Sequence, residues 1–390
     1  MQIQAEIEPS QSLLPATNGF HGGQIVARRD MNILQATKSY EDWMRTCTTL
    51  VESQIRDKHA RMKEDLYSFF RGTFYRWAQL CPEVCGDLSS APEILAVGDL
   101  HIDSFGTWRD TEGRLAWGVD DFDESYPLSY TNDLVRLAAS VKIAIDSETL
   151  AIPFKEACDV ILTGYRTTLK GEGCSFVLAE RERNLERLGI KEIVPPEDFW
   201  QKLNRRPDAR LAIPCVAKRA LEAELPKGLD YRIVRREAGT GSLGRQRFVA
   251  IGEWKGGYIA REAKAVTPSA CAWLDGRKRS PRLYYEDAIE DAVRSHDPFQ
   301  KIIQGWLIRR LSADSNPIEV AGWPAKRDER TLLHAMGCEA ANVHLGTSSQ
   351  IRKVLNDLQR RKSTWLRTAA KQMAKALEAD WKEYKQSRRR

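Results

Sequence analysis

The most constraining feature of this chain is an acidic stretch, residues 97–124 (VGDLHIDSFGTWRDTEGRLAWGVDDFDE). It contains two acidic clusters, GDLHIDSFG and VDDFDE, separated by a short run with the turn-forming residues Asp110 and Gly113. An apolar, strand-like segment lies beside each cluster, EILAV at the first and LAWGV at the second. Carboxylates at the ends of buried strands are costly to desolvate, and they usually remain because a cation or a proton transfer needs them. The stretch therefore predicts two strands whose ends carry a chemically active site.

Composition and charge limit the class of protein. The chain has 390 residues, of which 42% are hydrophobic and 29% charged, which is typical of a folded protein with more than one lobe. The net charge of +6 is small for this length, so it does not predict a nucleic-acid partner. The eight cysteines are dispersed, and no stretch resembles a signal peptide or approaches the length of a membrane span. We therefore expect a cytoplasmic protein without a membrane partner, whose oligomeric state the sequence does not give.

Changes in composition and hydrophobic pattern along the chain predict four segments. Residues 1–35 are polar and contain several prolines and glycines, as in a flexible arm. Residues 36–228 predict a mainly helical catalytic lobe that carries the acidic clusters. Residues 229–325 are rich in glycine and in β-branched or aromatic residues, which indicates an antiparallel sheet that binds nucleotide. Residues 326–390 predict C-terminal helices that pack on the catalytic lobe.

Two local patterns make this outline more specific. Apolar side chains recur at three- and four-residue spacing in the first helical region, which predicts a helix face directed at the core. These residues are Leu66, Phe69, Phe70, Phe74 and Trp77. Within the β-rich segment, a further helix is predicted over about residues 281–293.

Residues 239–244 (GTGSLG) match the glycine pattern G-x-G-x-x-G, which two different folds use to approach phosphates. A dinucleotide-binding loop is followed by a helix, whereas here the strand-like run RQRFVAIG follows. Strand, glycine loop and strand is the arrangement of a kinase glycine-rich loop, which predicts a lysine on the next strand. Lys264 is in that position, with Arg261 as a rival cation. A simple glycine hairpin followed by a solvated charged strand is the alternative.

The predicted phosphate-contacting residues of this region are Gly239, Thr240, Gly241, Ser242, Gly244 and Lys264. Glu286 or Glu290 is a hypothetical partner that positions Lys264.

The acidic stretch fits the few side chains that kinase chemistry needs. One aspartate orients or deprotonates the attacking hydroxyl, an oxygen or amide ligand follows five positions later, and a second aspartate beyond a hairpin binds metal. Ser104 follows Asp99 by five positions, as the metal ligand after the first aspartate should. Asp121 lies beyond the predicted hairpin, in the place of the second aspartate, and Asp123 stands where the kinase motif has a glycine. Asp133, near the start of a predicted helix, is expected to brace the catalytic loop.

Three further residues leave alternatives open. His101 belongs to the predicted catalytic set, either as a brace of the loop, which we favour, or as a metal ligand. Asp120 is a turn residue or a metal ligand. Arg71, in SFFRGT, is a charge inside an apolar face; it holds a phosphate or a carboxylate of a ligand, or forms a structural ion pair, which we favour.

The segment GDLH also fits metallophosphoesterases, in which Asp-x-His begins a dimetal site. That class needs further clusters of Asp, Asn and His downstream, such as GNH, and none occurs among the six histidines of this chain. A metal-dependent phosphoesterase is therefore the weakest of the three functional hypotheses.

Taken together, the motifs resemble a known family, the bacterial domain of unknown function 2252. The likeness rests on SFFRGT, GDLHIDSFG, DDFDE, NDLVRLAAS, AGTGSLG and REAKA, which occur in the same order over most of the chain. The acidic motifs of that family also resemble those of aminoglycoside phosphotransferases and related small-molecule kinases. This resemblance implies catalytic and metal-binding places for Asp99, Ser104 and Asp121. Family members usually carry asparagine at the places of Ser104 and Asp120, so this chain departs from the pattern there.

The resemblance implies an α+β fold like that of protein kinases, with two lobes. In an ordinary kinase the glycine loop precedes the acidic motifs, whereas here it follows them by more than a hundred residues. Our hypothesis is therefore a circularly permuted kinase-like fold.

The leading functional hypothesis is an ATP- and magnesium-dependent phosphotransferase acting on an acceptor that the sequence does not identify, for which a small molecule is one candidate. Asp99 is the base or orienting group, and Asp121, Asp123 and Ser104 are the metal ligands. The alternative from another class is a nucleotide-binding pseudokinase with a regulatory role, which Ser104 and the missing DFG-type glycine favour.

Overall fold

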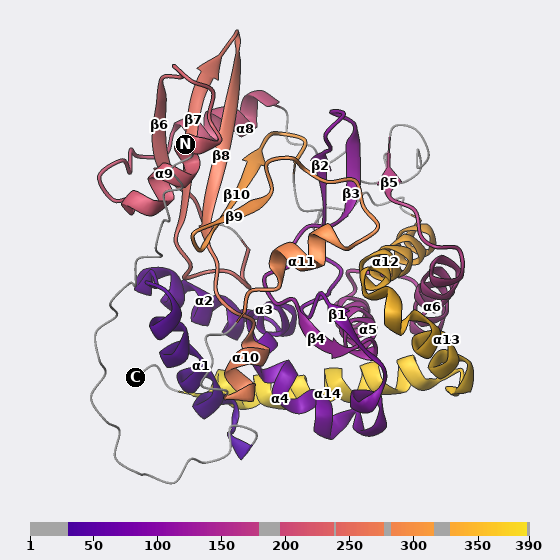
Figure 1. Ribbon diagram of the computed structural model, residues 1–390. Helices are drawn as coiled ribbons and strands as arrows, with labels where there is room; N and C mark the ends of the chain where they lie inside the picture. The colour runs from indigo at the N-terminus through magenta and orange to yellow at the C-terminus, as the bar shows by residue number, and fades with distance from the viewer. Residues whose placement is uncertain (1–29, 179–195, 238, 277–281, 316–327, 388–390) are drawn as a thin grey trace, which may run out of the picture.

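The computed structural model describes residues 30–178, 196–237, 239–276, 282–315 and 328–387. Helices form the larger part, and the strands of these residues make one five-stranded sheet and two smaller ones (Figure 1). The α+β class predicted from the sequence is confirmed. Most of the predicted N-terminal arm lies outside the described residues. Within the described part of the chain, no helix combines the length and apolar character that a membrane crossing requires.

The first part of the chain is helical, as the aromatic stripe predicts. The elements are α1 (Ile33–Cys47), α2 (Glu52–Glu64), α3 (Leu66–Gly72), α4 (Phe74–Val84) and the 3-10 helix η2 (Gly86–Ser90). Asn32 caps α1 by accepting from the backbone N–H of Gln35, and Asp65 caps α3 by accepting from that of Ser68. Four aromatic residues of the stripe are buried in the main core, and Leu66 packs against it partly buried. This prediction is confirmed.

Both strand-like segments of the acidic stretch are strands, but they belong to different sheets. β1 (Glu93–Ala96) pairs antiparallel with β4 (Tyr126–Ser129). β2 (Phe105–Arg109) and β3 (Leu115–Val119) form a hairpin, and β5 (Phe176–Val177) pairs with the other edge of β3. The acidic clusters therefore lie in the loop between β1 and β2 and in the loop after β3.

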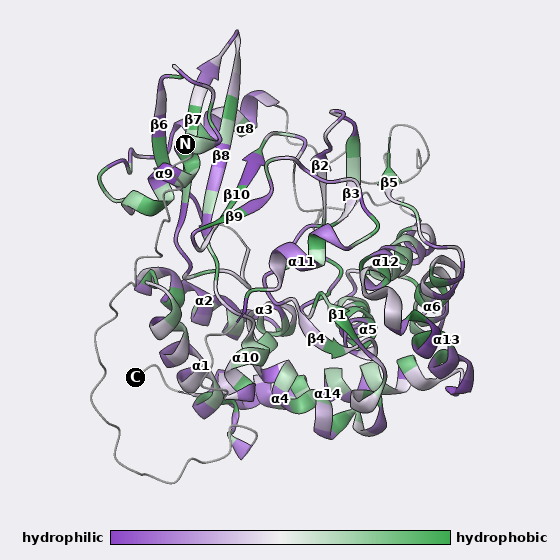
Figure 2. Ribbon diagram, viewed as in Figure 1, coloured by the Kyte–Doolittle hydropathy of each residue, from purple (hydrophilic) through white to green (hydrophobic). Residues whose placement is uncertain are grey.

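Helices that follow β4 in the sequence and helices from the C-terminal end of the described chain surround these strands. They are α5 (Thr131–Asp146), α6 (Phe154–Lys170), α12 (Glu329–His344), η5 (Leu345–Gln350), α13 (Ile351–Arg360) and α14 (Trp365–Gln386). α5 is buried along most of its length, and α14 runs beneath it across the molecule (Figure 1). In Figure 2, hydrophobic residues concentrate on α5 and α12, whereas much of the peripheral α13 is hydrophilic.

Two glycines allow α6 and α12 to pack closely. A Cβ atom on Gly164 of α6 would lie 2.2 Å from the carbonyl oxygen of His334, and one on Gly337 of α12 would lie 2.2 Å from that of Ile161. Both distances are far below van der Waals contact, so only glycine fits at these two positions without moving a helix.

The β-rich segment forms the predicted antiparallel sheet. Its strands are β6 (Tyr231–Arg235), β7 (Arg247–Trp254), β8 (Gly257–Ala265), β9 (Lys301–Ile303) and β10 (Trp306–Leu311). Their order is β6-β7-β8-β10-β9, and every neighbouring pair is antiparallel. The glycine loop connects β6 to β7.

Short helices precede this sheet and also separate β8 from β9 in the chain. α8 (Pro196–Asn204) and α9 (Cys215–Ala223) precede it in sequence, and apolar residues of α9 pack against β6, β7, β8 and β10. α10 (Ala270–Asp275) and α11 (Tyr285–Glu290) follow β8 and contribute to the main core instead. The helix predicted over about residues 281–293 therefore exists only as the shorter α11.

Glu339 of α12 is a buried carboxyl in the main core. Its Oε1 accepts from the backbone N–H of Val119 at 3.2 Å, and its Oε2 accepts from Asn342 Nδ2 at 2.9 Å. Burial raises the pKa of Glu339 to about 7, although the positive charge of Arg294 acts in the opposite direction. Folding therefore favours the protonated form of this residue.

This raised pKa predicts a pH dependence of stability. Between the unfolded pKa of about 4.5 and the folded value, only the folded chain keeps the proton, so stability falls as pH rises through this window, by up to about 3 kcal/mol. Glu339→Gln cannot lose a proton and is expected to flatten the decline in melting temperature between pH 5 and 8. The exposed Glu378→Gln on α14 is the control and should keep the wild-type slope. A Glu339→Gln slope equal to that of wild type would contradict the assignment.

Candidate functional site

The two acidic loops and the glycine loop meet at a small cavity of about 60 Å³. Segments far apart in the sequence line it, including the end of α3, the loops after β1 and β3, and the β6–β7 loop. The lining residues are Arg71, Asp99, His101, Asp103, Ser104, Asp121, Asp123, Glu124, Gly239, Gly241, Ser242 and Arg245. Most of the site residues predicted from the sequence therefore come together in one place.

Asp133 fixes the loop that carries Asp99. Its carboxylate is fully buried and accepts from the backbone N–H groups of Val97 at 2.7 Å and Gly98 at 2.9 Å. His344 Nε2, at the end of α12, lies 3.0 Å from the same carboxylate. Gly98 has a φ of +83°, and a Cβ there would lie 2.2 Å from the carbonyl oxygen of Glu124. The predicted bracing role of Asp133 is confirmed by these hydrogen bonds.

Asp99 is paired with an arginine that the sequence reasoning missed. Arg136 of α5 donates from Nε to Asp99 Oδ1 at 2.5 Å, and its side chain is fully buried. Its guanidinium lies over the rings of Phe70 at 4.1 Å, Trp77 at 4.9 Å and Phe74 at 5.1 Å. Burial raises the pKa of Asp99, and the charge of Arg136 opposes that rise. The sequence feature that could have identified Arg136 is its charge within the largely apolar helix pattern of NDLVRLAAS.

His101 and Ser104 both stabilise the loop after β1. His101 Nδ1 accepts from the backbone N–H of Asp103 at 3.2 Å, and burial lowers the pKa of His101 well below its usual value. Ser104 Oγ donates to the carbonyl oxygen of Asp99 at 3.0 Å and accepts from the N–H of His101 at 3.0 Å. A neutral His101 that braces the loop is the favoured alternative of the two predicted for it. The hydroxyl of Ser104 is engaged within the loop.

The second acidic cluster faces the cations of the sheet. Lys264 Nζ is buried, pairs with Asp123 Oδ2 and lies 3.6 Å from Asp121 Oδ1. Arg245 Nη1 lies 2.7 Å from the same Asp123 oxygen. The other oxygen of Asp123, Oδ1, is buried and has no hydrogen-bond partner among the described residues. Burial lowers the pKa of Lys264, which Asp121 and Asp123 counteract.

The structure distinguishes the two cations predicted on β8. Lys264 and Arg261 are three residues apart, so their side chains leave the strand on opposite faces. Arg261 lies over the ring of Phe299 at 3.7 Å, and its Nη1 donates to the carbonyl oxygen of Ala260. Lys264 is therefore the cation at the acidic cluster. Neither predicted glutamate partner positions it, because Glu286 accepts from the backbone N–H of Ile302 and Lys264 pairs with the two aspartates.

The glycine loop packs tightly on α2 and α3. Gly244 has a φ of +97°, and a Cβ there would lie 2.2 Å from Ile55 Cδ1. Its carbonyl oxygen accepts from the N–H of Val51 at 2.8 Å, and its own N–H donates to Gln54 Oε1. A Cβ on Gly241 would lie 3.1 Å from the carbonyl oxygen of Arg71. Because strand β7 follows the loop, the dinucleotide-binding arrangement with a following helix does not occur here.

Thr240 and Ser242 of the loop are both buried, and Ser242 Oγ accepts from Arg247 Nη2 at 2.7 Å. Arg71 forms an ion pair with Asp103 at 3.1 Å, which is the structural pairing favoured from the sequence. Arg245 is a further residue of the site that sequence reasoning did not select, although it directly follows Gly244.

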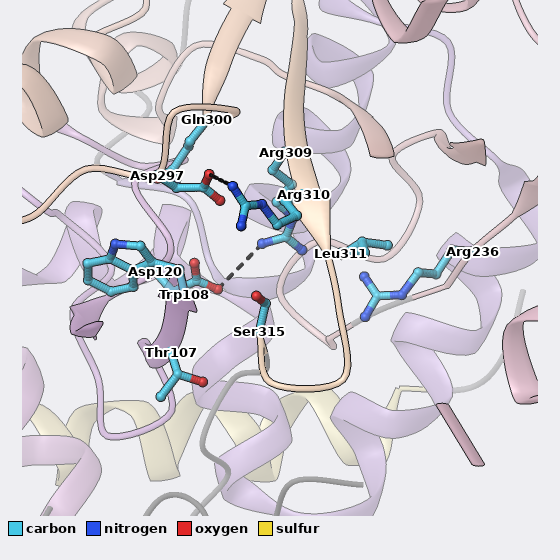
Figure 3. A pocket seen from close by; sticks show the side chains of 10 residues that line it. All are labelled: Thr107, Trp108, Asp120, Arg236, Asp297, Gln300, Arg309, Arg310, Leu311 and Ser315. Carbon is cyan, nitrogen blue, oxygen red and sulfur yellow. Dashed lines mark hydrogen bonds and ion pairs between the residues drawn. The ribbon is translucent and has the colours of Figure 1, made fainter. Parts of the chain in front are cut away.

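Asp120 points away from this cavity into a neighbouring one (Figure 3). Its Oδ2 lies 3.4 Å from Arg309 Nη1, and its N–H donates to the carbonyl oxygen of Ser104 at 2.9 Å. Arg309 in turn donates from Nε to Glu262 Oε2 at 2.7 Å. Asp120 thus links the acidic loop to charged residues of the sheet.

The described residues contain no group of three or more His, Cys, Asp or Glu side chains arranged to hold a metal ion on their own. Asp121 and Asp123 contribute two carboxylates, of which Asp121 is 55% exposed and Asp123 carries the unpartnered buried oxygen. Magnesium is commonly held by one or two protein carboxylates together with substrate phosphates and water. These two residues fit such a shared site.

A family model matches part of this chain. No curated protein and no solved structure matches this chain. Residues 50–191 match the model of a family described as an uncharacterized protein conserved in bacteria, DUF2252. The matched range begins just before α2 and includes both acidic clusters and Asp133, so the comparison supports the resemblance of this chain to the DUF2252 family.

Proposed function

We propose that this protein is a magnesium-dependent phosphotransferase that uses ATP and has a circularly permuted kinase-like arrangement. The observation that carries the proposal is the contact of Lys264 with Asp123 and Asp121, since Lys264 and Asp123 are 141 residues apart in sequence. Lys264 is on the third strand of a sheet whose first two strands flank the glycine loop. A lysine on the third strand and an aspartate after a hairpin are the pair that holds phosphates and metal in kinases.

Asp99 is positioned to orient or deprotonate the hydroxyl of an acceptor. Its side chain is 20% exposed and lines the cavity, so one oxygen can reach a ligand while Oδ1 stays bound to Arg136. The hydrogen bonds from Val97 and Gly98 to Asp133 hold the loop backbone in place. A base that is fixed by neighbouring groups needs no reorganisation during the reaction.

Asp121 and Asp123 are the residues that would hold magnesium. The unpartnered Oδ1 of Asp123 supports this assignment, because a buried carboxylate oxygen is rarely left without a donor or cation. Bound magnesium neutralises charge on the transferring phosphate. Lys264 and Arg245, which now pair with Asp123, are close enough to exchange that carboxylate for phosphate oxygens.

The volume of the cavity sets a condition on binding. Ligand sites usually enclose about 300–1,000 Å³, and this one encloses about 60 Å³. Nucleotide entry therefore requires the glycine loop to separate from the helices it contacts, through Gly244 on α2 and Gly241 on α3. The φ angles of +46° at Gly239 and +97° at Gly244 place glycines, the residues best able to change conformation, at both ends of the loop.

The second candidate function is a nucleotide-binding pseudokinase with a regulatory role. It is favoured by Ser104, which stands where an amide ligand is expected and whose hydroxyl is engaged within its own loop. This alternative predicts nucleotide binding without turnover over a broad panel of acceptors. A metal-dependent phosphoesterase gains no support, because the described residues contain no metal-ligand cluster of the kind that class uses.

Lys264→Met tests the proposal by binding. Methionine has nearly the same volume but no charge, so we expect the affinity for magnesium-ATP to fall by about tenfold or more, since one charge-assisted contact is lost. The measurement is isothermal titration calorimetry, supported by thermal shift with and without magnesium. The control is Lys218→Met on α9, whose side chain is 41% exposed and pairs with Glu222, and which should bind like wild type. If wild-type protein shows no binding of any nucleotide, both the phosphotransferase and the pseudokinase are excluded.

A further inference from the structure

The sheet face beside Lys264 is charged, unlike the apolar wall of a usual ligand pocket. Glu262 leaves β8 on the same face as Lys264 and is fully buried. In the neighbouring strands, Arg247 lies opposite Lys264 and Arg309 lies opposite Glu262. This face therefore carries alternating charges at the positions flanking the proposed phosphate site.

Three arginines converge on Glu262. Its oxygens lie 2.7 Å from Arg309 Nε, 2.8 Å from Arg236 Nη1 and 3.1 Å from Arg247 Nη1. These positive charges hold the pKa of Glu262 well below its usual value, although burial acts in the opposite direction. Arg309 also contacts Asp120, which directly precedes Asp121 in the sequence. The network is thus continuous with the site itself.

Charged side chains also line the cavity next to the site. It lies between β10, the β2–β3 hairpin and the segment before β9, and encloses about 20 Å³ (Figure 3). Five of its ten lining side chains are charged, and the figure shows Arg309 directed at Asp120 and Arg310 at Asp297. Trp108 is the aromatic residue of this lining, and the guanidinium of Arg294 already lies over its ring at 4.3 Å.

A nucleotide base needs a different environment. Bases are held by stacking on aromatic faces and by apolar walls, and the ring of Trp108 is already covered by Arg294. A base inserted along the sheet face would separate Glu262 from its arginines and leave a buried charge without compensation. A phosphate chain needs positively charged hydrogen-bond donors instead. Lys264, Arg245 and Arg247 place such donors around the glycine loop.

We infer that this site recognises the triphosphate chain of its ligand and not the base. The inference rests on the proposed function and makes it more specific. The ligand class is a chain of three phosphates with a divalent cation, supplied either by a nucleoside triphosphate of any base or by inorganic tripolyphosphate. Lys264 and Arg245 provide its recognition, together with the donors of Arg247 and Arg236 other than the Nη1 atoms that contact Glu262, so that Glu262 keeps its arginine partners.

The test is calorimetric titration of the full chain in magnesium buffer with ATP, GTP, CTP, UTP, inorganic tripolyphosphate and adenosine. We expect the four nucleotides and tripolyphosphate to bind within about threefold of one another and adenosine not to bind, because a difference of that size is under 1 kcal/mol. If tripolyphosphate binds and none of the four nucleotides does, the inference is supported and inorganic tripolyphosphate is the source of the phosphate chain. ATP would then be excluded as the phosphate donor. A preference for ATP of more than about tenfold over the other three would overturn the inference and leave the phosphotransferase proposal standing. Binding of none of the ligands would overturn both.

Arg236→Gln supplies a second readout. Arg236 lines the neighbouring cavity, its side chain is 20% exposed, and its removal leaves Glu262 with two arginine partners, so the fold should persist. The affinity for all four nucleotides and for tripolyphosphate is expected to fall by the same factor. A loss confined to ATP would show recognition of the base and contradict the inference.

Discussion

Asp121→Asn is expected to lower magnesium-dependent phosphoryl transfer by at least about a hundredfold, the cost typical of losing one charge-stabilising contact at a reacting group. Asparagine keeps the shape of the side chain but removes the negative charge that attracts a divalent cation. Because the Asp121 side chain is 55% exposed, the substitution should not change the melting temperature by more than a few degrees. The measurement is kcat/KM for ATP over a range of magnesium concentrations, with thermal denaturation in parallel.

Asp120→Asn is the matched control for this experiment. The two aspartates are adjacent, yet Asp120 faces the neighbouring cavity and contacts Arg309 at 3.4 Å. We expect Asp120→Asn to reduce kcat/KM by less than about tenfold, since it removes one long and partly solvated ion pair. If Asp121→Asn were as active as wild type, or if Asp120→Asn were the more damaging variant, the assignment of Asp121 as a magnesium ligand would be wrong.

The features predicted correctly from the sequence are those that depend on local patterns. The stripe containing Phe69, Phe70 and Trp77 gave the helical core face because helical periodicity is visible within a few turns. The antiparallel sheet was predicted from the glycine, β-branched and aromatic residues of 229–325, and in the structure the turn between β7 and β8 lies at Lys255 and Gly256, which both have positive φ angles. Asp133 was selected because it lies near the start of a predicted helix downstream of the acidic clusters, the place expected of a residue that braces the loop.

The features that the sequence left open depend on contacts across the fold. Arg136 pairs with Asp99 and His344 with Asp133, at separations of 37 and 211 residues, and no local pattern gives such partners. The helix predicted over about residues 281–293 ends at Glu290, and the N–H of Val293 donates instead to the carbonyl oxygen of Asn342. A tertiary hydrogen bond thus replaces the helical one, which a single sequence does not reveal.

Asp133→Ala is expected to have the largest effect on stability, lowering the free energy of unfolding by about 3–5 kcal/mol. The carboxylate is fully buried and accepts from the N–H groups of Val97 and Gly98, from Asn132 Nδ2 at 3.1 Å, and contacts His344. Alanine would leave the N–H groups of Val97 and Gly98 buried without this acceptor, and each such group costs about 1–3 kcal/mol. The loop that carries Asp99 would lose its anchor at the same time. Urea denaturation with a shared m-value measures the difference in stability.

Asp146→Ala provides the comparison within the same helix. Asp146 is near the end of α5, its side chain is 57% exposed, and its partner Lys142 is one helical turn away. Surface ion pairs of this kind contribute about 0–1 kcal/mol, so this variant should unfold at nearly the wild-type urea concentration. Asp133→Asn separates charge from shape, because an amide oxygen can still accept one of the two backbone hydrogen bonds, and it should lie between the two alanine variants. If Asp133→Ala unfolded with the same midpoint as Asp146→Ala, the carboxylate would not hold the loop, and the fixed position proposed for Asp99 would lose its physical basis.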